Sequence, residues 1–264
     1  MDKQNGTRQT ENKQSEFDRS TAKERIDRID PYGFERSEDF DYDSHEEFMS
    51  VYLAILTRRS IKWSKLLKGN NKVVKNIKVK RYVRKGIPNE HRSLIWMAAS
   101  GAQAQLEQNP GYYRKLLEGE RDPRLEDTIK TDYYSPAMLG LKTDQEVLGE
   151  LVKLKVPAVA ELMETHNVMW TLVVSRWFIC LFIDILPVET VLRIWDCLFY
   201  EGSKIIFRVA LTLIKHNQAH IQQATNFPDI CDKFKEIIRG ELVDDCHTFM
   251  QVSAFVFQLN NHTN

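Results

Sequence analysis

Hydrophobic residues recur along most of this chain at intervals of three and four positions, the spacing of one face of an α-helix. The first such segment follows Ser44, where residues 44–47 have the form of a helix-capping box, and it continues to residue 56. A second segment covers residues 61–67. No stretch of the sequence alternates in the manner of a strand between hairpin turns. The pattern therefore predicts an all-α, multi-helix protein whose helices pack around one core.

Proline, glycine and capping residues mark the expected ends of helices in the second half of the chain. Pro157 is predicted to open one helix, and Pro187 to open another that Gly202 ends. Residues 143–146 form a second capping box and predict a further helix start. Residues 170–185 are apolar on nearly all sides, which indicates a central helix buried on most of its faces.

Three charged residues lie inside these apolar segments. Arg176 and Asp184 interrupt the longest apolar run, and a membrane span would have to bury both charges, so a core helix is favoured. Asp196 lies within the helix predicted after Pro187. Buried charges need partners, so we expect internal ion pairs that fix helix packing. The alternative is that some of these charges hold a binding surface in place.

Composition divides the chain into three parts. Residues 1–43 are polar and charged without a hydrophobic signal segment, which predicts a disordered N-terminus and a cytoplasmic protein. Residues 44–80 form an N-terminal helical and basic segment, and residues 81–264 form the main helical domain. Lys and Arg equal Asp and Glu at 37 each, which argues against a globally basic nucleic-acid-binding protein.

The basic residues are nevertheless concentrated. Residues 58–85 hold twelve Lys and Arg and no acid. The simplest interpretation is a solvated helix face. The alternative is contact with an acidic partner or an anionic membrane surface, which would make the protein peripheral to membranes.

Motifs for cofactor or metal chemistry are absent from the sequence. There is no phosphate-binding Gly-rich loop of either common type. His216 and His220 have zinc-ligand spacing, but no glutamate follows His216 and no third ligand is evident, so a solvated helix face is expected. The four cysteines show no Cys-x-x-Cys spacing and are expected to be reduced, mostly buried thiols. We therefore predict neither a metal nor a cofactor.

Four segments, in this order, resemble the TBC domain, the family of Rab GTPase-activating proteins. Residues 86–96 match Gly-Ile-Pro-x-x-x-Arg-x-x-x-Trp, and residues 129–132 match the front half of the family's arginine motif. Residues 175–182 and 186–202, the latter containing Ile-Trp-Asp, complete the resemblance. The resemblance implies an all-helical fold, a GTP-bound Rab as partner and a role in vesicle traffic.

The resemblance also assigns roles to individual residues. It implies that Arg92 and Trp96 support the first helix of the domain and that Asp132 helps to hold the catalytic arginine. Trp195 and Asp196 would belong to the later helical core. In the family, that arginine neutralises charge on the transferring phosphoryl group and a glutamine orients the attacking water.

This chain departs from the family at the arginine motif. In the pattern Ile-x-x-Asp-x-x-Arg, which begins here at Ile129, Ser135 occupies the arginine position, and the Tyr-x-Gln motif that carries the glutamine is absent. Asp132 runs directly into Tyr133, which resembles a much later part of the domain, so an internal deletion is predicted near 132/133.

Three functional interpretations follow. The first is a TBC-family regulator of Rab GTPases that is catalytically impaired and has no catalytic residue of its own. The second is a non-catalytic module that binds a Rab or another protein. The third is a poorly folded chain, because removal of helices from a single core exposes their former neighbours.

Overall fold

A computed structural model of the chain describes residues 29–30, 32–33, 35–36, 40–68, 73–118, 133 and 137–255. It divides into two compact units, residues 1–53 and residues 54–264. The described residues form helices, and the only β contact among them is an isolated bridge between Ile29 and Glu35. The prediction of an all-α fold is therefore confirmed. Most of the predicted disordered N-terminus, residues 1–43, lies outside the described residues.

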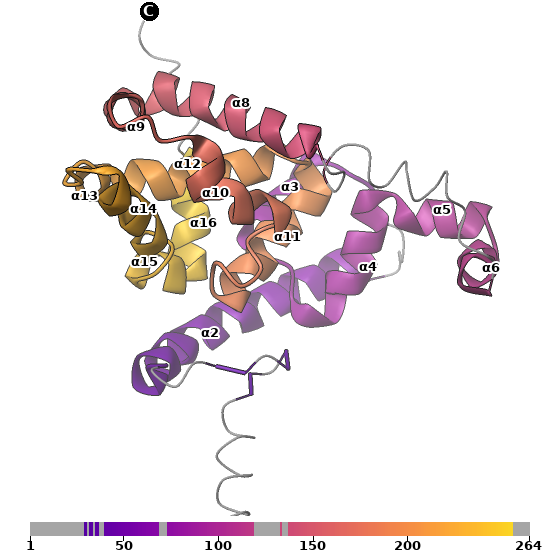
Figure 1. Cartoon of the computed structure of the whole chain (residues 1–264). Coiled ribbons are helices and arrows are strands. Elements are labelled where there is room, and N and C mark those ends of the chain that lie inside the picture. Colours follow the sequence, from indigo (N-terminus) through magenta and orange to yellow (C-terminus); the bar gives the residue numbers. More distant parts are fainter. Residues whose placement is uncertain are drawn as a thin grey trace, which may run out of the picture. The chain divides into compact units, whose positions relative to one another are not determined.

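The order of the helices along the chain can be followed in Figure 1. In order, they are α2 (Tyr42–Leu67), α3 (Ile77–Lys85), α4 (Asn89–Ser100), α5 (Ala102–Gln108), α6 (Tyr112–Glu118), α8 (Leu139–Lys155), α9 (Pro157–Thr165), α10 (Trp170–Ile179), α11 (Val188–Glu201), α12 (Lys204–His216), α13 (Gln218–Ile221), α14 (Phe227–Glu236), α15 (Glu241–Asp244) and α16 (Cys246–Phe255).

Helix α2 begins earlier than the sequence predicted. The capping box was expected at Ser44, but the helix starts at Tyr42 and Asp41 provides the cap. The Asp41 carboxylate accepts hydrogen bonds from the Ser44 backbone N–H at 3.0 Å and from the Ser44 hydroxyl at 2.6 Å. The two helices predicted for residues 44–56 and 61–67 are one helix, because no Gly or Pro separates them.

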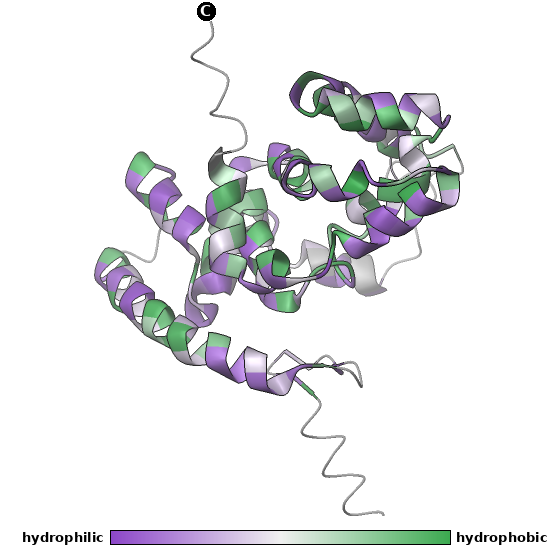
Figure 2. Cartoon of the chain, turned by 90° about the vertical axis from the view of Figure 1, so that its left-hand side faces the viewer, coloured by the Kyte–Doolittle hydropathy of each residue, from purple (hydrophilic) through white to green (hydrophobic). Residues whose placement is uncertain are grey.

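Helix α11 is the centre of the second unit. It packs against α3, α4, α12 and α16, while α8 packs against α9, α10 and α12 (Figure 1). Hydrophobic and hydrophilic residues occur on the same helices, as Figure 2 shows, which is the pattern of helices that bury one face against a core. Pro187 and Gly202 flank α11 as predicted, and Pro157 occupies the first turn of α9.

The central helix predicted for residues 170–185 ends sooner than expected. Helix α10 stops at Ile179, and a turn follows in which Leu181, Phe182 and Asp184 all have positive φ. A left-handed backbone at three non-glycine residues cannot continue a right-handed helix. Phe182 is fully buried, so tertiary packing of its ring stabilises the turn. Leu172 is 54% exposed, which also contradicts burial on nearly all sides.

The helix start predicted from the second capping box is also wrong. Residues 143–146 lie inside α8, which already begins at Leu139 after Met138, a residue with φ of 47°. Leu141 and Leu148 are buried on one side of this helix, so packing extends it beyond the local start signal.

Within the part of the chain that the structure describes, no helix combines the length and apolar character needed to cross a membrane.

Candidate functional site

The Asp196 carboxylate accepts hydrogen bonds from three groups that lie about a hundred residues earlier in the chain. The Ile87 backbone N–H donates to one oxygen at 2.9 Å. Arg92 Nε donates to the other oxygen at 3.1 Å and Trp96 Nε1 donates to the same atom at 3.0 Å. We call Ile87, Arg92, Trp96 and Asp196 the Asp196 cluster. It joins the loop before α4, helix α4 itself and α11.

Helical spacing positions the donors of this cluster. Arg92 and Trp96 are four residues apart on α4 and therefore project from one face of that helix. Pro88 precedes α4 and restricts Ile87 to an extended conformation, which directs the Ile87 N–H toward α11. The spacing Gly-Ile-Pro-x-x-x-Arg-x-x-x-Trp thus places three hydrogen-bond donors around one carboxylate.

Burial and neighbouring positive charge have opposing effects on the pKa of Asp196. Its side chain is fully buried, and burial raises the pKa of the carboxyl group, whereas Arg92, Arg193 and the Ile87 N–H oppose that rise. All three hydrogen-bond partners are donors, so the two oxygens act only as acceptors. Arg193 lies 3.9 Å from Asp196 on the same helix and adds a second positive charge.

Arg193 also ties α11 to the loop at Gly86. Its Nη2 donates to the Arg84 carbonyl at 2.8 Å, and Trp63 Nε1 donates to the Gly86 carbonyl at 3.0 Å. Gly86 has φ of +110°, and a Cβ atom there would lie 2.7 Å from Arg193 Nε. A side chain at position 86 would therefore collide with the group that balances Asp196.

Aromatic contacts complete the α4–α11 interface. The rings of Trp96 and Trp195 lie 6.0 Å apart, and Phe199 contacts both. Trp195 Nε1 donates to the Leu181 carbonyl at 3.1 Å, in the turn that follows α10. The structure therefore brings together Arg92, Trp96, Trp195 and Asp196, four of the motif residues singled out from the sequence.

The other motif residues cannot be placed. Ile129, Asp132 and Ser135 lie outside the described residues, as does most of the predicted junction near 132/133. Tyr133 is described: its hydroxyl donates to the Asp144 carboxylate of α8 at 2.6 Å. Tyr133 also lines a pocket of about 300 Å³ with Phe178, Leu198 and other apolar residues.

Burial limits what the four assembled residues can do. Arg92 and Asp196 are buried and paired, so they cannot reach the nucleotide of a partner protein. Trp96 and Trp195 are half-buried against the core. The arrangement is suited to holding α4 on α11, and the supporting role given by the sequence resemblance stays a prediction.

A second charged cluster was not anticipated from the sequence. Glu201, at the end of α11, accepts hydrogen bonds from Arg84 at 2.5 and 2.7 Å, and Lys80 and Arg208 lie within 3.5 and 3.7 Å. Burial opposes ionisation, but these three bases outweigh it and lower the pKa of Glu201. The only sequence signal was that Lys80 and Arg84 share one helix face.

Arg176 and Asp184 form no ion pair with any residue that the structure describes. Arg176 and Asp184 are exposed, so the expectation of buried pairs is correct for Asp196 and wrong for these two. Asp184 lies in the left-handed turn rather than in a helix, which directs it to solvent.

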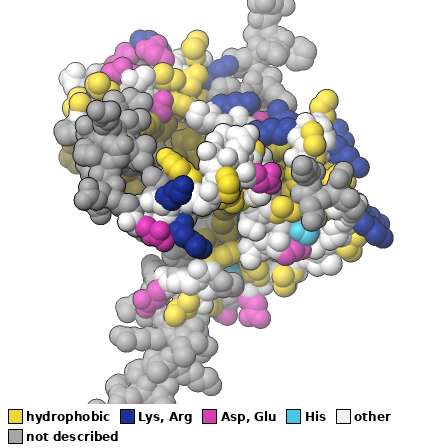
Figure 3. Space-filling model, turned by 90° about the vertical axis from the view of Figure 1, so that its right-hand side faces the viewer, with side chains coloured by type: hydrophobic (Ala, Val, Ile, Leu, Met, Phe, Trp, Pro, Cys, Tyr) yellow, Lys and Arg dark blue, Asp and Glu magenta, His cyan; other side chains and the backbone are white. Residues whose placement is uncertain are grey.

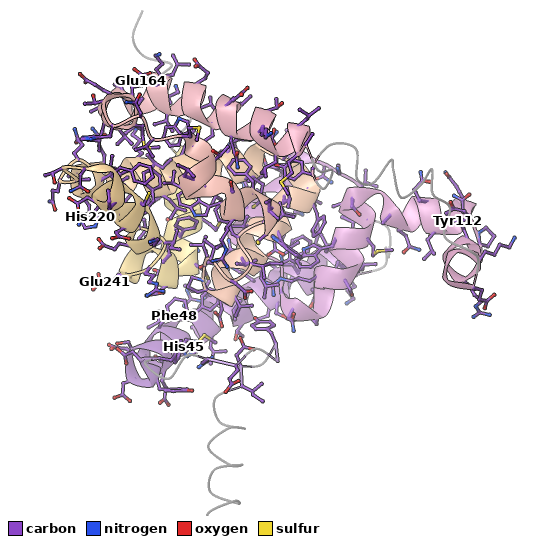
Figure 4. All side chains as sticks on the ribbon, in the orientation of Figure 1. His45, Phe48, Tyr112, Glu164, His220 and Glu241 are labelled. Carbon is purple, nitrogen blue, oxygen red and sulfur yellow. The ribbon has the colours of Figure 1, made fainter. Side chains whose placement is uncertain are left out.

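The two histidines with zinc-ligand spacing lie on different helices, because His216 is the last residue of α12 and Asn217 separates it from α13. His220 lies on α13 and contacts Glu236 at 2.6 Å (Figure 4). No group of metal-ligating side chains is found among the described residues. Cys197 and Cys246 are buried, Cys180 and Cys231 are half-buried, and no disulfide joins any of the four. Burial raises the pKa of the Cys197 thiol to about 12.

Comparison with known proteins gives consistent matches. Residues 125–222 match the family model of the Rab-GTPase-TBC domain. The chain is 53% identical to growth hormone-regulated TBC protein 1-A of Danio rerio, over 88% of this chain and 86% of that protein. It is 56% identical to growth hormone-regulated TBC protein 1 of Rattus norvegicus, over 87% of each chain. The Chlamydomonas flagellar RabGAP TBC domain has a similar fold, with a TM-score of 0.61, 20% identity, and coverage of 81% of this chain and 96% of that one.

The aligned regions differ in length. The Danio rerio alignment runs over 306 residues but covers 88% of this 264-residue chain, which is about 232 residues, so about 70 aligned positions have no counterpart here. The Rattus norvegicus alignment runs over 251 residues and covers 87%, or about 230 residues, so only about 20 positions lack one. Inside the aligned region, this chain is shorter than the Danio rerio relative.

Proposed function

This chain belongs to the Rab-GTPase-TBC domain family, and from that premise we propose that it regulates Rab-family GTPases while being impaired as an activator of GTP hydrolysis. The observation that carries the proposal is Ser135 at the position of the family's arginine, together with the absence of a Tyr-x-Gln motif. The roughly 70 aligned positions that have no counterpart in this chain support an internal deletion as the cause.

The size of the expected effect follows from the chemistry of phosphoryl transfer. An arginine supplied in trans contributes on the order of 10³–10⁵ to the rate of GTP hydrolysis. A serine hydroxyl carries no charge and cannot reproduce the planar guanidinium fork. Without the glutamine, the attacking water would also lose its orientation. The arginines at 92 and 193 cannot substitute, because both are buried at the Asp196 cluster.

Single-turnover GTP hydrolysis tests this proposal. A panel of GTP-loaded Rab proteins is mixed with an excess of this chain, so that weak binding does not hide catalysis. A TBC domain that retains both catalytic residues and acts on the same Rab serves as positive control. We expect rates within a few-fold of intrinsic hydrolysis, whereas an acceleration of about 10³ or more would refute the impairment.

A second candidate function is a non-catalytic Rab-binding or protein-interaction module. The observation that favours it is the completeness of the Asp196 cluster, whose contacts between α4 and α11 need neither missing side chain. Binding to Rab loaded with a non-hydrolysable GTP analogue, compared with GDP-loaded Rab, tests this function. Preference for the GTP form without faster hydrolysis would support it, and equal or absent binding to both forms would contradict it.

The location of the protein is part of the same proposal. A regulator of Rab proteins acts in the cytoplasm at membrane surfaces, and the basic stretch 58–85 offers a contact with anionic lipid. Such contact is electrostatic and should weaken with added salt, which vesicle sedimentation at two ionic strengths measures.

A further inference from the structure

A surface pocket of about 630 Å³ lies between α2, α3 and α16, and its lining is strongly basic. Six of its twelve lining residues are Lys or Arg, and none is acidic: Arg58, Arg59, Lys62, Arg81, Arg84 and Lys85. The volume is within the range of about 300–1,000 Å³ found for small-molecule sites. Figure 3 shows Lys and Arg side chains at several places on one face of the molecule. The pocket is therefore a place where positive charge converges on a concave surface.

The outer wall of this pocket contains two pairs of like charges. Arg58 and Lys62 are four residues apart on α2, and Arg81 and Lys85 are four residues apart on α3. Like charges at this spacing are neighbours on one helix face and repel each other, which destabilises the helix. All four side chains are exposed, and no carboxylate within the described ranges pairs with them. An anionic ligand would supply the missing counter-charge.

The inner wall is held rigidly. Arg84 is fixed by its two hydrogen bonds to Glu201, and Arg59 lies 2.8 Å from His247 Nδ1. Trp63 is 1% exposed and, with Gly86, forms the base of the pocket. A ligand would therefore meet preset groups deep in the pocket and adjustable long side chains at its rim.

The pKa of the His247 imidazole reflects the positive charge around the pocket. Burial lowers the pKa of its imidazole first, and Arg59 of α2, Arg193 of α11 and Lys85 of α3 lower it further. Asp245, just before α16, acts in the opposite direction. Three bases thus outnumber one acid around this ring, and a further positive charge is disfavoured there.

We propose that this pocket binds a ligand that carries two or more phosphate groups, either as the headgroup of a phosphoinositide or as a soluble inositol phosphate. The inference deepens the proposed membrane contact by naming its chemistry and place. Phosphate oxygens accept strong charge-assisted hydrogen bonds from Lys and Arg. Six basic residues on two helices that line one cavity suit clustered phosphates better than the single charge of an ordinary acidic lipid.

The experiment uses the full chain and three probes. Soluble inositol 1,4,5-trisphosphate is titrated by calorimetry. Vesicles of phosphatidylcholine with phosphatidylinositol 4,5-bisphosphate are compared, by sedimentation, with phosphatidylcholine–phosphatidylserine vesicles of equal total charge. We expect the soluble probe to bind and the phosphoinositide vesicles to be preferred. Equal binding to both vesicle types with no binding of the soluble probe would overturn the pocket but leave a general membrane contact intact.

Two matched double variants locate the site. Lys62→Gln with Lys85→Gln removes two charges from the pocket, whereas Lys65→Gln with Lys78→Gln removes two exposed charges from the same two helices outside it. We expect affinity for the soluble probe to fall about tenfold or more in the first variant and less than about twofold in the second. Equal losses in both would contradict a defined site.

Two further results identify the source of the ligand and the pH dependence of its binding. Binding of the soluble probe without vesicle binding would identify a free inositol phosphate and refute only the membrane contact. An NMR titration of the His247 imidazole should show its pKa rising when the probe is bound, so affinity should increase as pH falls toward that value. An unchanged His247 titration would place the ligand elsewhere. Because hydrolysis by Rab is not measured here, these outcomes are independent of catalytic impairment.

Discussion

Asp196 shows how much one side chain contributes to the packing of this protein. Its carboxylate accepts every hydrogen bond of the Asp196 cluster and lies near two arginines. If it were replaced by a neutral group, Arg92 and Arg193 would keep their charges in a buried site after losing the Asp196 carboxylate. A buried charge that loses its partner costs far more than the pair itself contributed.

We therefore expect Asp196→Asn to reduce the free energy of unfolding by about 3–5 kcal/mol, a large part of the stability of an ordinary domain. Urea denaturation followed by circular dichroism measures this loss. Asp184→Asn is the matched control, because Asp184 is exposed and its change should stay within about 0.5 kcal/mol. Similar effects of the two substitutions would contradict the role given to the cluster.

A second prediction concerns Gly86. Gly86→Ala places a Cβ atom 2.7 Å from Arg193 Nε at a residue with φ of +110°, so it combines backbone strain with overlap. Gly111 also has positive φ, at +75°, but has open space around it. Gly111→Ala should lower the free energy of unfolding by about 1–2 kcal/mol through backbone strain alone, and Gly86→Ala should lower it clearly more. Thermal denaturation of both variants separates the effect of backbone strain from that of steric overlap. Equal losses of stability in the two variants would argue against the overlap.

At the residue scale, the sequence identified several structurally important residues but did not predict their contacts. Arg92, Trp96, Trp195 and Asp196 were singled out through resemblance to a family, and the structure brings them together. Their hydrogen bonds join positions about a hundred residues apart, which no local pattern reveals. Arg176 and Asp184 were expected in ion pairs because they lie in an apolar run, but the backbone leaves the helix and exposes Asp184.

At the scale of elements, helix boundaries set by covalent chemistry were predictable. Pro157, Pro187 and Gly202 act through their own backbone restrictions, and the structure has boundaries at all three. The two capping boxes and the end of the 170–185 segment were wrong. In those cases a competing carboxylate at Asp41, or packing of neighbouring helices, decides where the helix begins or ends.

The C-terminal end of α11 yields a pH prediction. The pKa of Glu201 is lowered in the folded state, so its stabilisation is complete above the ordinary value of 4.5 and is lost as pH falls through the lower folded value. Glu201→Gln should cost roughly 1–3 kcal/mol at neutral pH. The difference between this variant and the parent should shrink below pH 4.5, as thermal melts across pH can measure.

The control for this prediction is Glu146→Gln on α8, which removes an exposed carboxylate. Its effect on the melting temperature should be small at every pH. A cost for Glu201→Gln that does not vary with pH would show that the lost contacts are not ionic.

At the scale of the whole molecule, the central question is whether the helices close one core in a chain shorter than its Danio rerio relative. The buried residues argue that they do, since Trp63, Val83, Leu148, Phe178 and Ile194 from five helices are almost inaccessible. Some apolar side chains remain at the surface, and Leu139, Leu154, Met169 and Leu172 are each more than half exposed. Exposed apolar surface of this kind favours association with other chains.

The sequence raised this question but could not answer it. The predicted deletion near 132/133 follows from motif order, whereas closure depends on how α8, which follows the deletion, packs against α9, α10 and α12. Closure also involves contacts between residues far apart in the sequence, such as Arg92 and Trp96 with Asp196. Local periodicity carries no information about such pairs.

Thermal unfolding of the purified chain, followed together in the far- and near-ultraviolet by circular dichroism, tests this closure. The far-ultraviolet signal reports the helices, and the near-ultraviolet signal reports the packing of buried aromatic rings such as Trp63 and Trp177. A closed core predicts one cooperative transition at the same temperature in both signals. Strong helical signal with little near-ultraviolet signal, or a gradual loss of helix, would indicate a chain without fixed packing and would contradict the closed core.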